Sequence, residues 1–126
     1  MQPFPHHYSA TAKGSAGTGV ELGAPGLSTL PSASPAEFDG PGDRWSPETL
    51  LTAAVGDCLI LTFRAVASAS KLEWTSLECD VTRTLDRVDR TTRFVAFDIR
   101  ARLQVPTGTD ADRARQVLEK AENRAV

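Results

Sequence analysis

Residues 46–70 read SPETLLTAAVGDCLILTFRAVASAS, the longest apolar run of the chain. Small and aliphatic residues recur in it every three or four positions, and no proline follows Pro47, which is the pattern of a helix. Ser46 can cap the first free N–H groups, Pro47 suits the first helical position, and the Glu48 carboxylate faces the positive end of the helix dipole. We therefore predict one long central helix over these residues.

This helix is apolar on more sides than a single sheet can cover. The polar residues Thr49, Thr52, Asp57 and Arg64 interrupt its surface without forming a full face. We expect its own sheet to bury one side and a second copy of the chain to cover another. Because Asp57 and Arg64 would be costly in lipid, we expect no membrane span.

Length and charge narrow the class of protein. The 126 residues suit one domain with a real core, and we expect a single domain over residues 1–126. A net charge of −2 without a basic block argues against nucleic acid or an anionic membrane as the main partner. Residues 1–14 lack the layout of a signal peptide. Two cysteines make no disulfide framework, so a cytoplasmic, reducing compartment is expected.

Short strands are predicted before the helix. Residues 6–13 and 20–22 form two strands in this interpretation, GSAGTG at residues 14–19 is the turn between them, and residues 25–29 form a third strand. GSAGTG lacks the lysine spacing of a phosphate-binding loop and no helix follows it, so we interpret it as a hairpin turn.

Two further features precede the helix. His6 and His7 would point to opposite faces of a strand and are the only histidines, so no metal site is expected. The loop at residues 31–45 is rich in proline and glycine, and a long loop of this kind often has a function. It carries Arg44 to the helix entrance, either as a functional cation or as a solvated partner of Asp43.

Two alternating runs follow the helix, at residues 72–85 and 93–105, and predict a long antiparallel hairpin with one polar face. Residues 110–124 predict an amphipathic second helix with a narrow apolar stripe. The predicted fold is therefore α+β with two layers, an antiparallel β-sheet packed on a long central helix. The hairpin residues expected to face inward are Leu77, Cys79, Val81, Leu85, Val95, Phe97, Ile99, Ala101, Leu103 and Val105.

Cys58, near the middle of the predicted central helix, is the residue with the clearest chemical potential. A cysteine in a buried helix most often behaves as a small hydrophobe. The functional alternative needs a cation that stabilises the thiolate, and Arg44 is the candidate. His6 and His7 do not complete a convincing Ser-His-Asp or Cys-His arrangement, so acyl transfer is not expected. Cys79, on the inward face of a strand, is interpreted as packing.

Residues 40–58, GPGDRWSPETLLTAAVGDC, resemble the OsmC/Ohr family of osmotically inducible and organic hydroperoxide resistance proteins, in particular its OsmC-like branch. The family's most telling signature is a Pro-Glu pair that opens a long apolar helix, with a cysteine ten residues after the glutamate, as in Glu48 and Cys58. The order of strands, long helix, hairpin and second helix is also similar. The resemblance implies an OsmC-like intertwined homodimer.

The resemblance also implies a thiol-dependent peroxidase that reduces organic hydroperoxides. Cys58 corresponds to the peroxidatic cysteine, whose thiolate attacks the terminal peroxide oxygen, releases water or an alcohol and becomes a sulfenic acid. Glu48 matches the family glutamate, and Arg44 would stabilise the thiolate and orient the peroxide. No cofactor and no metal are implied. A dithiol reductant of the lipoyl type would return the cysteine to its reduced state.

Helix geometry gives a second, independent argument about Glu48 and Cys58. Ten residues along one helix span about 15 Å, so Glu48 and Cys58 cannot meet within a single helix. If they share a site, an oppositely running helix from a neighbouring chain must supply one of them. This predicts a homodimer with two composite sites.

The sequence departs from the family pattern at two places. Family members carry a resolving cysteine after the second helix, followed by more chain, whereas this sequence stops at Val126. Either this chain is truncated and lacks the family's C-terminal segment, or the protein itself has no resolving cysteine. As written, the sequence cannot complete the intramolecular disulfide or the recycling by a dithiol. Asp57 directly precedes Cys58, and its field opposes thiolate formation. Two alternatives stay open: a non-catalytic OsmC-like binding module for a small apolar ligand, and a fragment or structural dimer with an inert buried cysteine.

Overall fold

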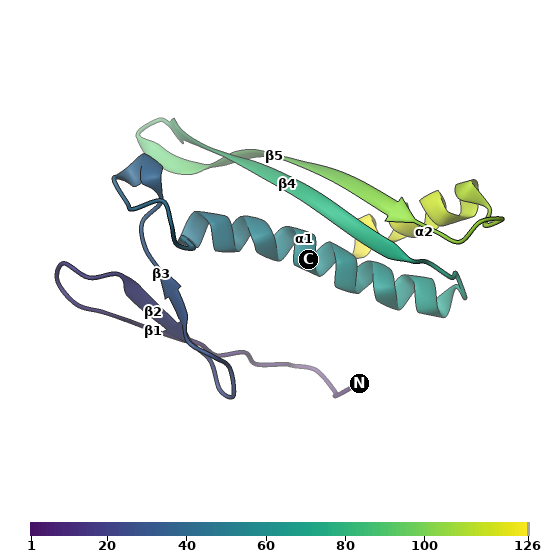
Figure 1. Ribbon diagram of the computed structural model, residues 1–126, viewed down its shortest axis with the longest axis horizontal. Helices are drawn as coiled ribbons and strands as arrows, with labels where there is room; N and C mark the ends of the chain where they lie inside the picture. Colours follow the sequence, from purple (N-terminus) through teal and green to yellow (C-terminus); the bar gives the residue numbers. More distant parts are fainter. Residues whose placement is uncertain (126) are drawn as a thin grey trace. The chain divides into compact units, whose positions relative to one another are not determined.

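The computed structural model describes residues 1–125 and comprises two compact units, Met1–Leu50 and Leu51–Val126, here called unit 1 and unit 2. Two α-helices and two antiparallel sheets make the fold α+β, as predicted (Figure 1). Along the chain, the elements are β1 (Thr11–Gly14), β2 (Val20–Gly23), β3 (Leu30–Ser32), the 3₁₀ helix η1 (Ala36–Phe38), α1 (Pro47–Ala69), β4 (Ser76–Val88), β5 (Thr91–Gln104) and α2 (Ala111–Arg124). The boundary between the units falls in the first turn of α1.

Unit 1 contains a three-stranded antiparallel sheet in the order β1-β2-β3. The predicted hairpin turn at residues 14–19 is confirmed, since β1 pairs with β2 and Gly17 adopts a φ of 77°. The predicted strand at 25–29 is wrong. Pro25 and Gly26, with a φ of 75° at Gly26, occupy the centre of a tight turn in which the Leu27 N–H donates to the Ala24 carbonyl over 3.1 Å. A proline followed by a glycine is turn chemistry, so the strand begins only at Leu30.

The two ends of α1 are capped in different ways. At the start, the buried Ser46 side chain accepts a hydrogen bond of 3.1 Å from the Thr49 N–H, which confirms the predicted cap. At the end, Lys71 adopts a left-handed φ of 56° and the Leu72 N–H donates to the Ala67 carbonyl over 2.9 Å. This is a Schellman arrangement with a lysine where glycine is usual, and the buried Leu72 anchors it.

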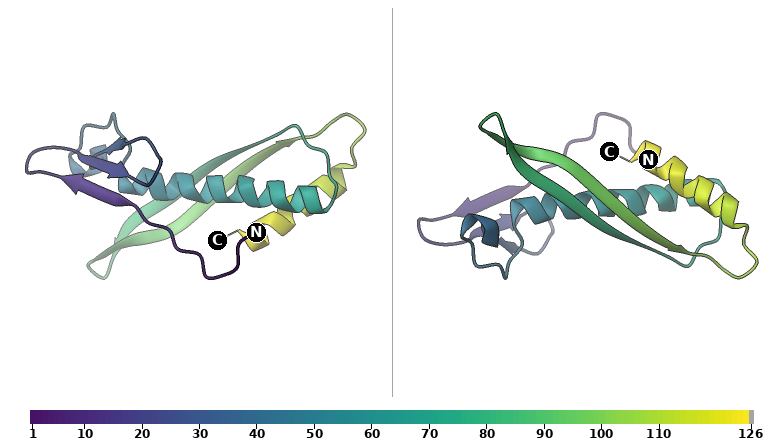
Figure 2. Two further views of the ribbon diagram at one scale, coloured as in Figure 1. Left: turned by 90° about the horizontal axis from the view of Figure 1, so that it is seen from below. Right: turned by 90° about the horizontal axis from the view of Figure 1, so that it is seen from above.

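In unit 2, β4 and β5 form one long antiparallel hairpin. Asp89 and Arg90 make its turn, with φ values of 51° and 69°, as a two-residue turn that matches the twist of the strands requires. The strands therefore continue into the segment 86–92, which lies between the two predicted alternating runs at residues 72–85 and 93–105. Figure 2 shows the hairpin crossing α1 obliquely, with its turn at the end far from α2.

The hairpin contains a bulge that changes which residues face inward. Thr84 pairs with Ala96 and Leu85 pairs with Phe94, so Val95 is an extra residue on β5. Two hairpin residues that were predicted to face inward are largely exposed, Val95 at 45% and Phe97 at 66%. The register places Phe94 and Phe97 on the same side of the hairpin, opposite Leu85 and Arg83 respectively.

The core of unit 2 forms where the second half of α1, the open end of the hairpin and α2 meet. The predicted apolar stripe of α2 supplies part of it, and the Asp110 side chain caps that helix by accepting from the Asp112 N–H over 3.0 Å. Phe63 is fully buried and its ring makes an edge contact with Trp74 at 5.1 Å between centroids. The buried apolar residues are Leu59, Phe63, Val66, Ala67, Leu72, Leu77, Ala114, Val117 and Ala121.

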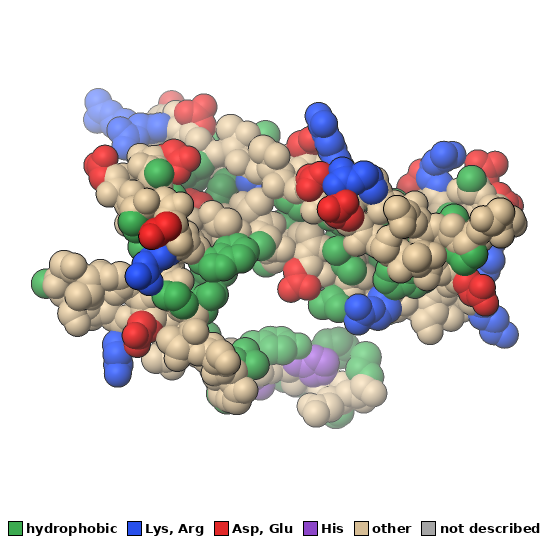
Figure 3. Space-filling model, in the orientation of Figure 1, with side chains coloured by type: hydrophobic (Ala, Val, Ile, Leu, Met, Phe, Trp, Pro, Cys, Tyr) green, Lys and Arg blue, Asp and Glu red, His purple; other side chains and the backbone are tan. Residues whose placement is uncertain are grey.

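The other face of the hairpin is polar, as predicted. Arg102 lies 2.7 Å from a Glu78 oxygen and 2.9 Å from an Asp80 oxygen, which places one guanidinium between two carboxylates on exposed strands. Figure 3 shows acidic and basic side chains gathered over the hairpin. This face is suited to water, whereas the opposite face of the hairpin packs on the helices.

By length and composition, α1 is the one helix within residues 1–125 that could cross a membrane. The same criteria select the core helix of many globular proteins. Here α1 places Leu59, Phe63, Val66 and Ala67 in the core of unit 2 and also carries Asp57 and Arg64.

Gly56 allows α1 to lie close to β4, and replacing it should loosen unit 2. A Cβ atom at this position would lie 3.1 Å from Val81 Cγ2 and 3.7 Å from Cys79 Cβ. We expect Gly56→Val to lower the free energy of unfolding by about 1–3 kcal/mol through overpacking. Gly56→Ala should be near neutral, because its gain in helix propensity of up to about 1 kcal/mol offsets a tight but adjustable contact.

Urea unfolding would measure both effects, with Ala53→Val as the matched control on an exposed position of the same helix. That control puts valine on the same helix without the contact. Because valine is a better helix former than glycine, a loss of stability in Gly56→Val comes from the contact and not from helix propensity. Equal stability of the Gly56→Val and Ala53→Val variants would contradict the close approach of α1 and β4.

Candidate functional site

Cys58 lies half-buried near the middle of α1, on an apolar stripe that the core of unit 2 does not cover. We call Leu51, Ala54, Cys58, Leu61 and Ala65 the Cys58 stripe. Its members are spaced alternately by three and four residues, which places them on one side of a helix. Leu51 is 49% exposed and Leu61 is 51% exposed. At about 100° per residue, the stripe lies opposite the core residues Phe63 and Ala67.

One polar side chain of the same helix reaches the thiol. The Cys58 Sγ atom lies 3.9 Å from Thr62 Oγ1, one helical turn further on, within the range of a hydrogen bond to sulfur. Either atom can donate, so the hydroxyl can serve a thiol, a thiolate or an oxidised sulfur. The sequence analysis did not identify Thr62, although its spacing of four residues from Cys58 was a sufficient signal.

Cys79 lies on a different side of α1 from Cys58. Gly56 faces it, because a Cβ atom built on Gly56 would be 3.7 Å from the Cys79 Cβ. The two residues from Gly56 to Cys58 turn the helix by about 200°, so the Cys58 side chain leaves α1 on the other side. Both cysteines are free. This geometry agrees with the interpretation of Cys79 as a packing residue and does not favour a disulfide between the two within one chain.

The surroundings of Cys79 keep its thiol protonated. Its pKa is raised chiefly by burial and further by the negative charges of Asp80 and Glu122, while Arg102 acts in the opposite direction. Because the thiolate is the reactive form, these effects make Cys79 a poor nucleophile near neutral pH.

Arg44 and Glu48, the other two predicted site residues, belong to unit 1. Arg44 is exposed on the loop after η1, where no carboxylate of unit 1 forms an ion pair with it, so the proposed pairing with Asp43 is absent. Arg44 also lines a cavity of about 720 Å³ with Lys13 and Phe38. Glu48 is half-buried in the first turn of α1.

The three predicted site residues thus come from two units, Arg44 and Glu48 from unit 1 and Cys58 from unit 2. Their convergence in one site stays a prediction. α1 is one uninterrupted helix over Pro47–Ala69, so the spacing of Glu48 and Cys58 on which the sequence argument depended holds. Within residues 1–125, no three His, Cys, Asp or Glu side chains are grouped as metal ligands.

Arg83 is a candidate that the sequence analysis missed. It is half-buried on the inward face of β4, in phase with Val81 and Leu85, and its guanidinium carbon lies 4.2 Å from the centre of the Phe94 ring. The strict alternation of β4 already placed this arginine on the apolar face. Only the apolar members of that face were predicted to point inward, so Arg83 was not among them.

The raised pKa of Cys79 predicts how the two thiols differ in reactivity. At any pH below that pKa, less of the Cys79 thiol is deprotonated than for an unperturbed thiol, so its alkylation should accelerate only at more alkaline pH. We expect iodoacetamide to label Cys79 in the Cys58→Ser variant several-fold more slowly at pH 8 than it labels an unfolded control of the same variant. Mass spectrometry of the labelled peptide against pH measures this, and equal rates in the folded and unfolded protein would contradict it.

Comparison of the sequence and the fold with known proteins identifies a family. The family model described as OsmC-like protein matches residues 40–126. An OsmC-like protein of unknown function from Vibrio cholerae superposes with a TM-score of 0.86 at 13% identity, over 96% of this chain and 90% of that chain. No curated protein sequence matches the chain.

Two organic hydroperoxide resistance proteins are also similar in structure. The protein from Legionella pneumophila, OsmC, has a TM-score of 0.76 at 23% identity, over 98% of this chain and 87% of that chain. The protein from Elizabethkingia anophelis has a TM-score of 0.78 at 17% identity, over 98% of this chain and 86% of that chain. These likenesses show a shared fold, and the family model covers more than half of the chain. The protein therefore belongs to the family of OsmC-like proteins.

Proposed function

We propose that this protein is a thiol-dependent peroxidase that reduces organic hydroperoxides at Cys58. The observation that carries the proposal is the position of Cys58, which lies outside the core of unit 2 on an apolar surface of α1. A cysteine that served only as packing would be expected among the core residues. Membership of the OsmC-like family and the likeness of the fold to two hydroperoxide resistance proteins support the same assignment.

The proposed reaction begins with the thiolate of Cys58. The Cys58 sulfur attacks the terminal oxygen of the hydroperoxide, the O–O bond breaks, and the organic oxygen leaves as an alkoxide that takes a proton to become the alcohol. The sulfur, now a sulfenic acid, has been oxidised by two electrons. A dithiol reductant then forms a mixed disulfide with release of water, and its second thiol displaces Cys58 as a free thiol. Thr62 can hold the sulfur by its hydroxyl during these steps.

The substrate class follows from the surroundings of the sulfur. The neighbours of Cys58 on its stripe are leucine and alanine side chains, and the stripe contains no charged residue. Such a surface favours a hydroperoxide with an apolar organic group over hydrogen peroxide, because burying the organic group adds hydrophobic stabilisation to the bound state.

We further propose that the active form is a homodimer. The Cys58 stripe is an apolar helix surface left uncovered by the chain's own core, and such surfaces commonly mark interfaces. A second α1 running in the opposite direction would bring Glu48 and Arg44 of one chain toward Cys58 of the other. Two composite sites would result, and Arg44 would supply the cation that the thiolate needs.

The first test is the intact mass of the protein before and after brief exposure to a small excess of cumene hydroperoxide. We expect the wild type and the Cys79→Ser variant to gain one oxygen, because Cys58 is oxidised in both. The Cys58→Ser variant should gain none. Loss of two hydrogens in the wild type would mean that a second thiol traps the sulfenic acid. An unchanged wild-type mass would overturn the peroxidase assignment.

A second test concerns the assembly. A glutamate in place of Leu61 would put a charge in the middle of the Cys58 stripe. Burying this charge at the interface would destabilise the dimer. We expect light scattering to give the mass of two chains for the wild type and of one chain for Leu61→Glu. Arg64→Gln, an exposed change on the same helix outside the stripe, should stay dimeric. A monomeric wild type, or a dimeric Leu61→Glu variant, would contradict the proposed interface.

A further inference from the structure

Unit 2 contains a cavity of about 500 Å³ between α1, the hairpin and the end of α2. Its apolar lining residues are Val55 and Leu59 from α1 and Phe97 and Ile99 from β5. The cavity is open to solvent, since Phe97 is 66% exposed. Val55 and Leu59 lie on a side of α1 that is turned away from the Cys58 stripe by about a quarter of a turn. The volume is in the range of small-molecule sites, about 300–1,000 Å³.

Three charged residues also line this cavity: Arg83, Asp98 and Glu122. Arg83 is among the lining residues, and its Nε–H is buried without a hydrogen-bond partner within residues 1–125. The Phe94 ring, 4.2 Å from the guanidinium carbon, holds the cation in place but accepts no conventional hydrogen bond from it. A charged donor that is removed from water without a partner is unfavourable, so the site is stabilised when an anion completes it.

The bulge at Val95 creates this arrangement. The pairing of Leu85 with Phe94 and of Arg83 with Phe97 puts both phenylalanines on the same face of the hairpin, where Phe97 is 66% exposed. Without the extra residue, the two phenylalanines, three positions apart, would lie on opposite faces of the strand. One ring then supports the guanidinium and the other forms a wall of the cavity.

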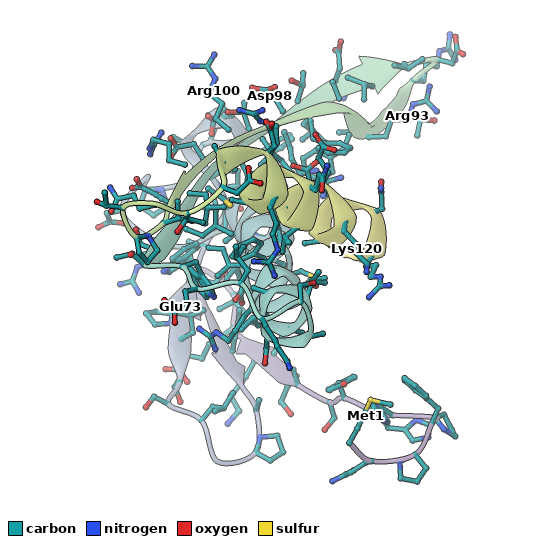
Figure 4. All side chains as sticks on the ribbon, turned by 90° about the vertical axis from the view of Figure 1, so that its right-hand side faces the viewer. Met1, Glu73, Arg93, Asp98, Arg100 and Lys120 are labelled. Atoms are coloured by element: carbon teal, nitrogen blue, oxygen red, sulfur yellow. The ribbon has the colours of Figure 1, made fainter. Side chains whose placement is uncertain are left out.

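The carboxylates near the cavity do not neutralise Arg83. Asp98 borders the cavity but belongs to the outer face of β5, where its carboxylate lies 3.7 Å from the Arg100 guanidinium. Figure 4 shows Asp98 and Arg100 on the hairpin, on the side away from α2. Glu122 lines the cavity from α2 and forms no ion pair with Arg83 in the described part of the chain. The negative charge of Glu122 would repel an anion from the α2 side of the cavity and so favour its binding at Arg83.

We propose that this cavity binds a small apolar monocarboxylate, with the carboxylate on Arg83 and the hydrocarbon part against Val55, Leu59, Phe97 and Ile99. An arginine offers a carboxylate two parallel N–H donors, which a hydroxyl or amine head group cannot use in the same way. The apolar walls stabilise the rest of the ligand by burial. The site needs no reaction at Cys58 and is independent of the proposed peroxidase activity.

Isothermal titration with decanoate tests the site, and 1-decanol serves as the probe without the charge. We expect decanoate to bind the wild type and the Cys58→Ser variant equally, and at least tenfold more tightly than decanol. Equal binding by Cys58→Ser separates this site from the proposed function, since that variant cannot act as a peroxidase.

Substitutions then assign the contacts. Arg83→Met keeps a long side chain over Phe94 and should weaken decanoate binding at least tenfold while leaving decanol unchanged. Arg87→Met, an exposed change on the same strand, should have no effect. Glu122→Gln should tighten decanoate binding several-fold, because it removes the repelling charge. Circular dichroism and thermal unfolding of each variant check that the fold is retained.

Three results would overturn the proposal. The first is an absence of decanoate binding to the folded wild type. The second is equal binding of decanoate and decanol, and the third is unchanged decanoate binding by Arg83→Met. If decanoate does not bind and Arg83→Met weakens the dimer in light scattering, a second copy of the chain covers the cavity.

Discussion

The close packing of α1 against β4 at Gly56 organises unit 2. Because Gly56 has no side chain, the helix axis can approach the strand until Val81 and Cys79 fill the contact. Gly56 lies on the side of α1 that is buried in unit 2. The core that α1 forms with α2 contains Leu59, Phe63, Val66 and Ala67, and the opposite side of the helix lies outside this core. A bulkier residue at this one position would move the helix that carries Cys58.

The helix is therefore apolar for two reasons. One side stabilises unit 2 through its core, and the other, the Cys58 stripe, presents apolar surface outside that core. Two such sides on one helix explain why its sequence has the composition of a membrane span. They also separate the two cysteines, since Cys79 packs against the core side at Gly56 and Cys58 lies on the stripe.

Much of the fold could be predicted from local sequence chemistry. Ser46 and Pro47 marked the start of α1, the alternation of residues 76–104 marked the hairpin, and the glycines of residues 14–19 marked a turn, because each of these signals acts over a few neighbouring residues. The candidate site was only partly predictable. The Glu48–Cys58 spacing indicated the family, whereas Arg83 on the apolar face was overlooked although the alternation contained it.

By itself, the sequence determined the order and type of the elements, the position of the peroxidatic candidate Cys58 and the family to which the chain belongs. The tertiary structure alone decided which side of α1 is buried, where the β5 register shifts, and that Arg83 and Phe94 meet beside an apolar cavity. The physical reason is the range of the interactions. Caps, turns and helical periodicity depend on residues a few positions apart, whereas a bulge or a helix face is selected by packing against residues far away in the chain.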